Sequence, residues 1–82
     1  MMQRRGDLHA RVVDDLGEAI IAGRLTEGTV IDLSAVEQRL GVSRSVVREA
    51  LRVLANLGLV EARHKVGTRV LPRSQWNLLH PR

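Results

Sequence analysis

Residues 34–57 constrain the fold of this chain more than any other segment, and they read SAVEQRLGVSRSVVREALRVLANL. The pattern predicts a short helix, a three-residue turn at Gly41-Val42-Ser43, and a second helix with one apolar face and three arginines. Two helices joined by a tight turn that contains glycine, the second one basic, are typical of a helix-turn-helix, which places its second helix in the DNA major groove. We therefore expect a nucleic-acid-binding motif in this segment.

The ends of both predicted helices carry residues suited to capping. Ser34 is expected to cap the first helix, because Glu37 three residues later gives the capping-box spacing. Gly41 supplies the flexible backbone where that helix stops. Ser43 is expected to cap the second helix, which ends at Gly58.

The second helix separates two kinds of side chain when it is drawn at about 100° per residue. Its apolar side is formed by Val47, Ala50, Leu51, Leu54 and Leu57. Arg44, Arg48 and Arg52 fall together on the other side with Ser45 beside them, and Glu49 is the helix's only acidic residue. Because a planar guanidinium can bond O6 and N7 of guanine together or clamp a phosphate, this side is expected to face DNA.

The charge of the chain is unevenly distributed. The formal net charge is +4, but residues 1–38 carry four basic and seven acidic side chains, and residues 39–82 carry nine basic and two acidic ones. A basic balance alone is weak evidence, since membranes and acidic proteins attract it too. Its concentration in the half that holds the motif is the distribution expected of a nucleic-acid-binding face.

A further amphipathic helix is predicted over residues 8–22. Its apolar residues recur at helical spacing, at Leu8, Val12, Leu16, Ala19 and Ile20. Asp7 is expected to cap its start and Gly23 to close its end. We expect its apolar side to pack on the two helices of the motif, and the β-branched residues at 29–33 could form a short strand.

Two short extended segments, residues 59–63 and 68–71, flank a loop after the motif and predict a β-hairpin. The fold class is therefore mainly α with a small hairpin: a winged helix-turn-helix of three helices and a two-stranded wing. His64 and Lys65 at the tip could reach the DNA backbone or a minor-groove edge, and the less favoured alternative for His64 is an ordinary exposed loop residue. Lys65 and Arg69 are better suited to phosphates than to bases.

The last ten residues are too few to fold alone. Pro72 ends the second predicted strand, and Trp76, Leu78 and Leu79 have no obvious apolar partner in so small a domain. Either they pack back on the domain or they belong to a linker, and the second interpretation is favoured.

Several short segments form a combination that is specific although none is specific singly. They are Ile20-Ile-Ala-Gly-Arg-Leu25, Glu27-Gly-Thr29, Leu40-Gly-Val-Ser-Arg-Ser-Val-Val-Arg-Glu-Ala-Leu-Arg-Val-Leu54, Leu57-Gly-Leu-Val60 and Gly67-Thr-Arg-Val70. With them, about residues 8–72 of the chain resemble the N-terminal DNA-binding domain of the GntR family of bacterial transcription regulators. The tail Gln75-Trp-Asn-Leu-Leu-His-Pro81 is similar to the linker of the subgroup that has an all-helical effector domain, several members of which govern sugar-acid use.

The resemblance implies a division of the chain and a set of partners. The implied parts are a DNA-binding domain at 7–72, with the helix-turn-helix at about 34–57 and the wing at about 59–71, and at 73–82 the start of a linker to an effector domain outside this sequence. The implied partners are a palindromic double-stranded operator, a second copy bound through the C-terminal domain, and a small-molecule effector in that domain. We expect no cofactor in this domain and no association with a membrane. We expect the protein to be cytoplasmic.

The resemblance also implies roles for single residues. Arg44 matches the Ser/Thr-Arg that starts the family's recognition helix, and Arg48 matches the Arg of its Val-Arg-Glu-Ala-Leu, so both are implied base or phosphate contacts. Ser45 matches a Thr or Ser that often touches phosphate, and His64 matches a wing-tip position that contacts DNA in a well-known member. The candidate DNA contacts are therefore Ser34, Ser43, Arg44, Ser45, Arg48, Arg52, His64, Lys65 and Arg69.

Three departures from the family pattern change what is expected. Many relatives have Glu-Arg-Glu-Leu-Ala where this chain has Leu33-Ser-Ala-Val-Glu37, so an arginine that reads DNA in some relatives is Ser34 here. Glu37 stands where a small alanine is usual, so the turn is expected to pack differently. Lys65 stands where relatives carry glycine at the wing tip.

Other functions fit the sequence less well. His9, His64 and His80 are isolated and there is no cysteine, so neither an enzyme nor a metal site is expected. A winged helix that binds a protein partner should lack a basic recognition face, which this chain has. Single-stranded nucleic acids are usually bound on aromatic platforms, and with one Trp and no Phe or Tyr the chain favours duplex DNA.

Overall fold

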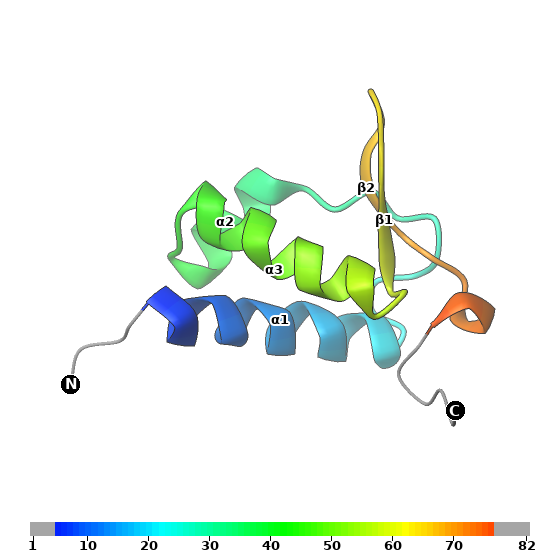
Figure 1. Ribbon diagram of the computed structural model, residues 1–82, viewed down its shortest axis with the longest axis horizontal. Helices are drawn as coiled ribbons and strands as arrows, with labels where there is room; N and C mark the ends of the chain where they lie inside the picture. The colour runs from blue at the N-terminus through cyan, green and yellow to red at the C-terminus, as the bar shows by residue number, and fades with distance from the viewer. Residues whose placement is uncertain (1–4, 77–82) are drawn as a thin grey trace.

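Three helices and a two-stranded hairpin form the predicted winged architecture (Figure 1). The structure is a computed structural model that describes residues 5–76 of the 82-residue chain, with side chains from residue 8 onward. Its elements in chain order are α1 (Arg5–Ile21), α2 (Leu33–Leu40), α3 (Arg44–Asn56), β1 (Val60–Arg63), β2 (Gly67–Val70) and the short 3₁₀ helix η1 (Arg73–Gln75). In Figure 1, α3 lies along α1, and the hairpin projects beyond the helices on the side away from α1.

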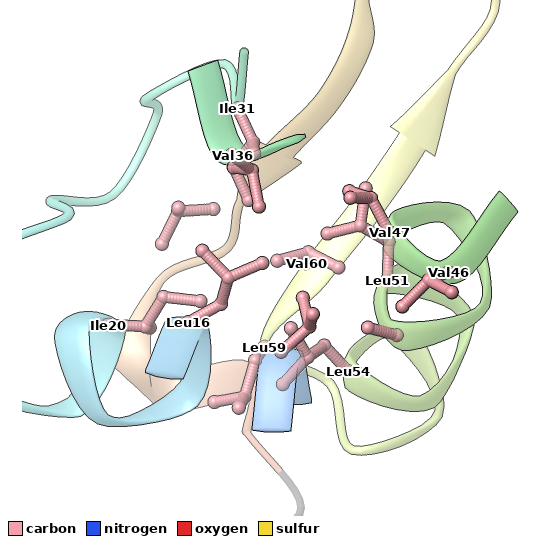
Figure 2. Close-up of a cluster of buried hydrophobic side chains, with 13 residues drawn as sticks. Leu16, Ile20, Ile31, Val36, Val46, Val47, Leu51, Leu54, Leu59 and Val60 are labelled. Atoms are coloured by element: carbon pink, nitrogen blue, oxygen red, sulfur yellow. The ribbon is translucent and has the colours of Figure 1, made fainter. Parts of the chain in front are cut away.

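The core lies where the apolar side of α3 meets α1 and the base of the hairpin (Figure 2). Leu16 and Ile20 of α1 are almost fully buried against Leu54 of α3, and Leu59 and Val60 close the core from the start of the wing. Within the described residues no polar or charged side chain is buried. Each large apolar side chain buried in this way contributes about 1.5–3 kcal/mol to stability, so the core depends on packing alone.

Helix α1 begins earlier than the sequence predicts. It starts at Arg5, so Asp7 lies within its first turn and the prediction that Asp7 caps the helix is wrong. The C-terminal end agrees with the prediction: the Gly23 amide donates to the carbonyl oxygen of Ile20 at 3.1 Å, and Gly23 adopts a left-handed φ of 87°. Glycine meets that conformation without a steric penalty, which explains why the chain turns there.

Helix α2 is capped by Asp32, so the predicted capping box at Ser34 is wrong. The Asp32 carboxylate accepts a hydrogen bond from the Ala35 amide at 3.2 Å. Because the helix begins at Leu33, Ser34 lies inside the first turn and its hydroxyl is released for another contact. At the other end Gly41 takes a left-handed φ of 66° and its amide donates to the Glu37 carbonyl, as predicted.

Helix α3 begins at the predicted residue, Arg44, and ends one residue before the predicted Leu57. The Ser43 hydroxyl accepts a hydrogen bond from the Val46 amide at 3.4 Å, which confirms Ser43 as its N-cap. The helix ends at Asn56, and Gly58 two residues later has a φ of 79°. The turn of Gly41 to Ser43 therefore holds the start of α3 in a defined direction relative to α2.

The hairpin is antiparallel and is joined by a third extended segment. Val60 pairs with Val70 at its base, and Arg63 pairs with Gly67 near its tip. Val30 forms a bridge with Arg69, so residues 29–33 contribute one bridge to the sheet instead of the full strand that the sequence allowed. The connector between α1 and α2 is thereby attached to the wing.

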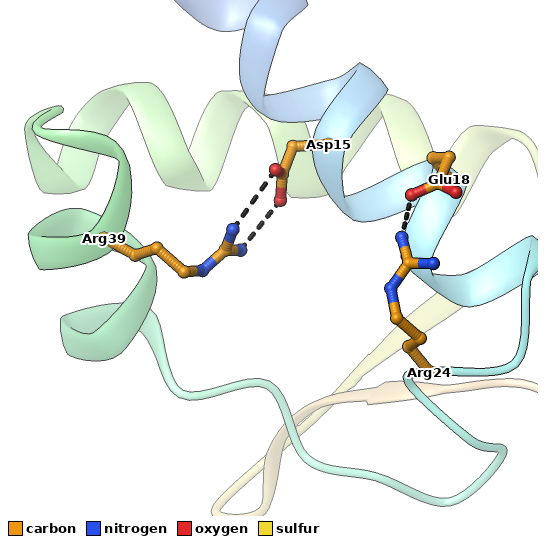
Figure 3. Close-up of polar contacts among 4 residues, drawn as sticks. All are labelled: Asp15, Glu18, Arg24 and Arg39. Atoms are coloured by element: carbon orange, nitrogen blue, oxygen red, sulfur yellow. Dashed lines mark hydrogen bonds and ion pairs between the residues drawn. The ribbon is translucent and has the colours of Figure 1, made fainter.

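Two ion pairs hold the segments around α1 (Figure 3). Arg39 of α2 donates to both oxygens of Asp15, at 2.7 and 3.1 Å, and Arg24 of the connector pairs with Glu18. The hydrogen bonds from Arg39 hold the pKa of the Asp15 carboxyl below its ordinary value. Both pairs lie at the surface, where such contacts are each worth less than about 1 kcal/mol.

The segment after the wing packs back on the domain as far as Trp76. The Trp76 indole N–H donates to the carbonyl oxygen of Leu71 at 3.1 Å, and its ring packs against the core. Arg73 lies over that ring, 4.6 Å from its centroid, and donates to the carbonyl oxygen of Ile21 at the end of α1. These contacts show that Trp76 packs back on the domain, which is the alternative that the sequence favoured less. Leu78 and Leu79 lie outside the described residues.

Candidate nucleic-acid interface

The outward side of α3 carries the predicted polar and basic residues. Arg44, Ser45, Arg48 and Arg52 are all exposed, whereas Val47, Ala50 and Leu54 on the opposite side have no exposed surface. The helical period alone produces this separation, because the basic residues recur every four positions and the apolar ones every three or four. One helix thus presents three guanidinium groups to solvent while its other side anchors it in the core.

At the start of α3, the Arg44 guanidinium is held by two side chains of α2. Its Nε donates to a carboxylate oxygen of Glu37 at 2.5 Å, and its Nη2 donates to the Ser34 hydroxyl at 2.8 Å. Ser34 and Glu37 are three residues apart and therefore lie on the same side of α2. Ser34, predicted to contact DNA, is placed here as a hydrogen-bond acceptor for Arg44.

Arg48 and Arg52 border a groove between α3 and the wing. Neither side chain forms a hydrogen bond or ion pair with any other described residue. The groove is lined by Arg48, Arg52, Ala55, Val60, Ala62 and Thr68. Its floor is largely apolar, so the two guanidinium groups at its edge are the groups available to an anionic ligand.

The wing tip presents His64, Lys65 and Val66 to solvent. Lys65 has a φ of 69°, a left-handed conformation that costs a side-chain-bearing residue energy and that glycine adopts freely. Val66 is a large apolar side chain that is 54% exposed. The tip therefore carries a positive charge and an apolar group on a tight turn.

The middle of the wing is held by an internal ion network. Glu61 accepts hydrogen bonds from Arg63 at 3.1 Å and from Arg69 at 3.2 Å. These contacts, that of Arg63 foremost, hold the pKa of the Glu61 carboxyl below its ordinary value. Arg69 is half-buried near the bridge to Val30, so its charge is partly neutralised away from the tip.

The structure thus sorts the predicted contacts into groups. Ser34, Arg44, Ser45, Arg48 and Arg52 lie on the outward side of α2 and α3, and His64 and Lys65 lie at the wing tip. The Ser43 hydroxyl is engaged in the cap of α3, and Arg69 is engaged with Glu61. Sequence reasoning missed Glu37 as the partner of Arg44; two opposite charges seven residues apart across a three-residue turn are the signal that could have found it.

The described residues offer little else that resembles a functional site. Among them no group of three or more His, Asp or Glu side chains is placed to hold a metal ion. None of the described helices combines the length and the apolar character needed to cross a bilayer. The surface of α2, α3 and the wing is therefore the candidate site.

A family model described as bacterial regulatory proteins, gntR family, matches residues 8–70. Over 70 residues the chain is 40% identical to an uncharacterized HTH-type transcriptional regulator, YieP, of Escherichia coli K12, which covers 83% of this chain and 30% of that protein. It is 34% identical over 70 residues to the galactonate operon transcriptional repressor of the same organism, covering 84% of this chain and 31% of the repressor.

Solved structures give the same likeness. A crystal structure of a GntR-family transcriptional regulator from Pseudomonas syringae pv. tomato DC3000 superimposes with a TM-score of 0.75 at 32% identity, covering 88% of this chain and 32% of that one. The chain thus spans about a third of the length of the relatives it matches.

Proposed function

This chain belongs to the GntR family of bacterial regulatory proteins, and we propose that it is the sequence-specific duplex-DNA-binding domain of a transcription regulator. The observation that carries the proposal is the outward side of α3, where Arg44, Ser45, Arg48 and Arg52 are exposed beside a projecting wing. In helix-turn-helix proteins the N-terminal residues of the second helix contact the base edges. Arg44 and Arg48 occupy those positions here.

The basic residues on this surface can contact DNA in two ways. An arginine whose end-on N–H groups reach guanine O6 and N7 discriminates between base pairs, whereas a cation against a phosphate positions the protein without reading sequence. Arg48, one helical turn from Arg44, is suited to the first role. Arg52, a further turn from the start of the helix, is suited to the second.

The wing supplies contacts to the backbone or the minor groove. Lys65 is exposed at its tip beside His64, so both can reach DNA that lies against α3. Arg69, whose guanidinium is bonded to Glu61, contributes through the general positive field unless that bond is released. The proposed division of roles is therefore base recognition by α3 and attachment by the wing.

The rest of the protein is proposed from the family. Because the chain spans about a third of its relatives, we place an effector domain after it, helical throughout as in the subgroup whose linker the tail resembles. That domain would join two copies on a palindromic operator and bind a small metabolite. A relative named as a repressor of a galactonate operon supports a sugar acid as the class of effector. The DNA-binding domain would need no cofactor. The whole protein would act in the bacterial cytoplasm as a repressor, not as an enzyme.

Selection from a randomised duplex pool tests the proposal. The 82-residue chain, alone and joined at its C-terminus to a dimeric coiled coil, is incubated with the pool at two salt concentrations, and retained duplexes are sequenced. An enriched short motif, recurring as inverted half-sites with the dimer, supports sequence-specific regulation. Salt-sensitive retention without enrichment would leave a non-specific DNA binder. No retention of either form, even at low salt, would overturn the proposal in favour of a protein partner.

A further inference from the structure

The contacts of Arg44 leave only one edge of its guanidinium available. Nε and Nη2 lie on the same edge of the group, and they are the two atoms that bond Glu37 and Ser34. Arginine has five N–H donors, so the remaining ones point outward from the end of the side chain. That end-on pair, Nη1 with Nη2, matches the spacing of two acceptors on a guanine edge.

Glu37 is itself held firmly in the turn that precedes α3. Its backbone carbonyl accepts hydrogen bonds from the amides of Gly41 at 2.8 Å and Val42 at 3.2 Å. Its side chain is 26% exposed, against 48% for that of Arg44. The backbone of Glu37 is therefore fixed relative to the start of the recognition helix, and its carboxylate bonds the guanidinium of Arg44 from that fixed point.

We infer that Glu37 is a specificity-determining positioning residue, which presents Arg44 end-on as a base reader and reduces its value as a phosphate contact. A held guanidinium loses less conformational freedom when it binds an edge in one orientation. The carboxylate also repels phosphates at short range, so a negative group here lowers affinity for arbitrary DNA while it favours the sequence that Arg44 fits. This inference rests on the proposed function, since it assigns a role within DNA recognition.

The other arginines of α3 supply the contrast. The bonds from Arg44 to Glu37 and Ser34 form a brace on its guanidinium. Arg48 and Arg52 have no comparable brace among the described residues, so their guanidinium groups can turn to meet a base or a phosphate. Glu49 is an exposed acid on the same helix and forms no hydrogen bond or ion pair with Arg44, whose side-chain partners are Glu37 and Ser34. It therefore provides a control that removes one negative charge near the surface and leaves the brace intact.

The test compares the base preferences of variants selected from the same randomised duplex pool. Arg44→Ala identifies the base pair that Arg44 reads. Glu37→Ala is expected to lose about tenfold discrimination at that same base pair, within the range of one bidentate contact, and to bind unrelated duplexes as well as or better than the parent. Glu37→Gln keeps an acceptor for Nε and is expected to lose less. Glu49→Ala should change total affinity and leave every base preference in place.

Several outcomes would overturn the inference. Unchanged preference at the Arg44 base pair in Glu37→Ala would remove Glu37 from specificity, and a change at a different base pair would make Glu37 a direct contact. Circular dichroism checks that each variant is folded; if Glu37→Ala is not, Glu37→Met, which also removes the acceptor, takes its place, and unchanged discrimination there decides against the inference. A parent chain that enriches no motif, alone or dimerised, would overturn the proposed function itself, which distinguishes the two failures.

Discussion

The two sides of α3 differ in role: the inner side supports the fold, and the outer side carries candidate DNA contacts. The inner side is apolar, has no exposed surface at Val47, Ala50 and Leu54, and packs on α1 and the wing. The outer side is polar and carries Arg44, Arg48 and Arg52, none of which contributes to the core. Because the helical period separates the two sets, stability and DNA binding should respond to different substitutions in one helix of 13 residues.

The largest effect is expected on the inner side. Leu54→Ala removes a fully buried side chain at the centre of the core and should lower the free energy of unfolding by about 2–5 kcal/mol. Urea denaturation measures this loss. Base preferences of the fraction that remains folded should be those of the parent, and a changed motif would break the division between the two sides.

Arg48→Ala tests the outer side. If Arg48 reads a base, the substitution should cost about 1–3 kcal/mol of binding and relax the preference at one base pair. Urea denaturation should give the parent's stability, because the side chain is exposed and has no partner among the described residues. An equal loss on every duplex would instead make Arg48 a phosphate contact.

Ser43 combines the two roles, stability and DNA binding, since it is both the N-cap of α3 and a predicted DNA contact. Ser43→Ala should lower the stability by about 1 kcal/mol through loss of the cap. Ser43→Asn is the matched control, because asparagine caps helices equally well. If Ser43→Asn is as stable as the parent yet binds its motif more weakly, then the hydroxyl contacts DNA as well.

Lys65 extends the comparison to the wing. Lys65→Ala should reduce the slope of log affinity against log salt by about 0.9, the value for one phosphate contact. Lys65→Arg keeps the charge and the same left-handed backbone position, so its slope should equal that of the parent. A slope that Lys65→Ala leaves unchanged would remove the wing tip from the interface.

The smallest effect concerns the ion pair that ties α2 to α1, away from both sides of α3. Arg39 lowers the pKa of Asp15 in the folded state, so the pair stabilises the fold above the ordinary pKa of an aspartate, and this contribution is lost as the pH falls through the lowered value. The contribution should be below about 1 kcal/mol. The midpoint temperature of thermal unfolding should therefore fall less between pH 6 and pH 3 in Asp15→Asn than in the parent. An equal fall in both proteins would assign the acid sensitivity to other groups.

The motif itself was predictable because its signals are local. The turn at Gly41 and the cap at Ser43 each depend on residues within one helical turn, and both are confirmed. The caps assigned to Asp7 and Ser34 were wrong for a related reason: several polar residues near a helix start can all serve as caps, and the backbone selects one. At α2, Asp32 was available two residues upstream.

Contacts between distant segments were less predictable. No local pattern specifies that Val30 meets Arg69, or that Trp76 packs on the core, because both depend on how the wing folds back on the connector and α1. The brace that Glu37 and Ser34 form on Arg44 was predictable to an intermediate degree. It joins residues only seven apart, but it forms because the first motif helix begins at Leu33 and turns Ser34 and Glu37 toward α3.

The packing of Trp76 gives this chain an optical probe of its own. Trp76 is the only tryptophan, and the chain has no tyrosine. Its indole is partly buried, bonded to Leu71 and covered by the guanidinium of Arg73, which also bonds the end of α1. Intrinsic fluorescence excited near the red edge of indole absorption therefore comes from a single point where the wing, α1 and the following segment meet. Any rearrangement at that junction would be read as a change in emission without a label.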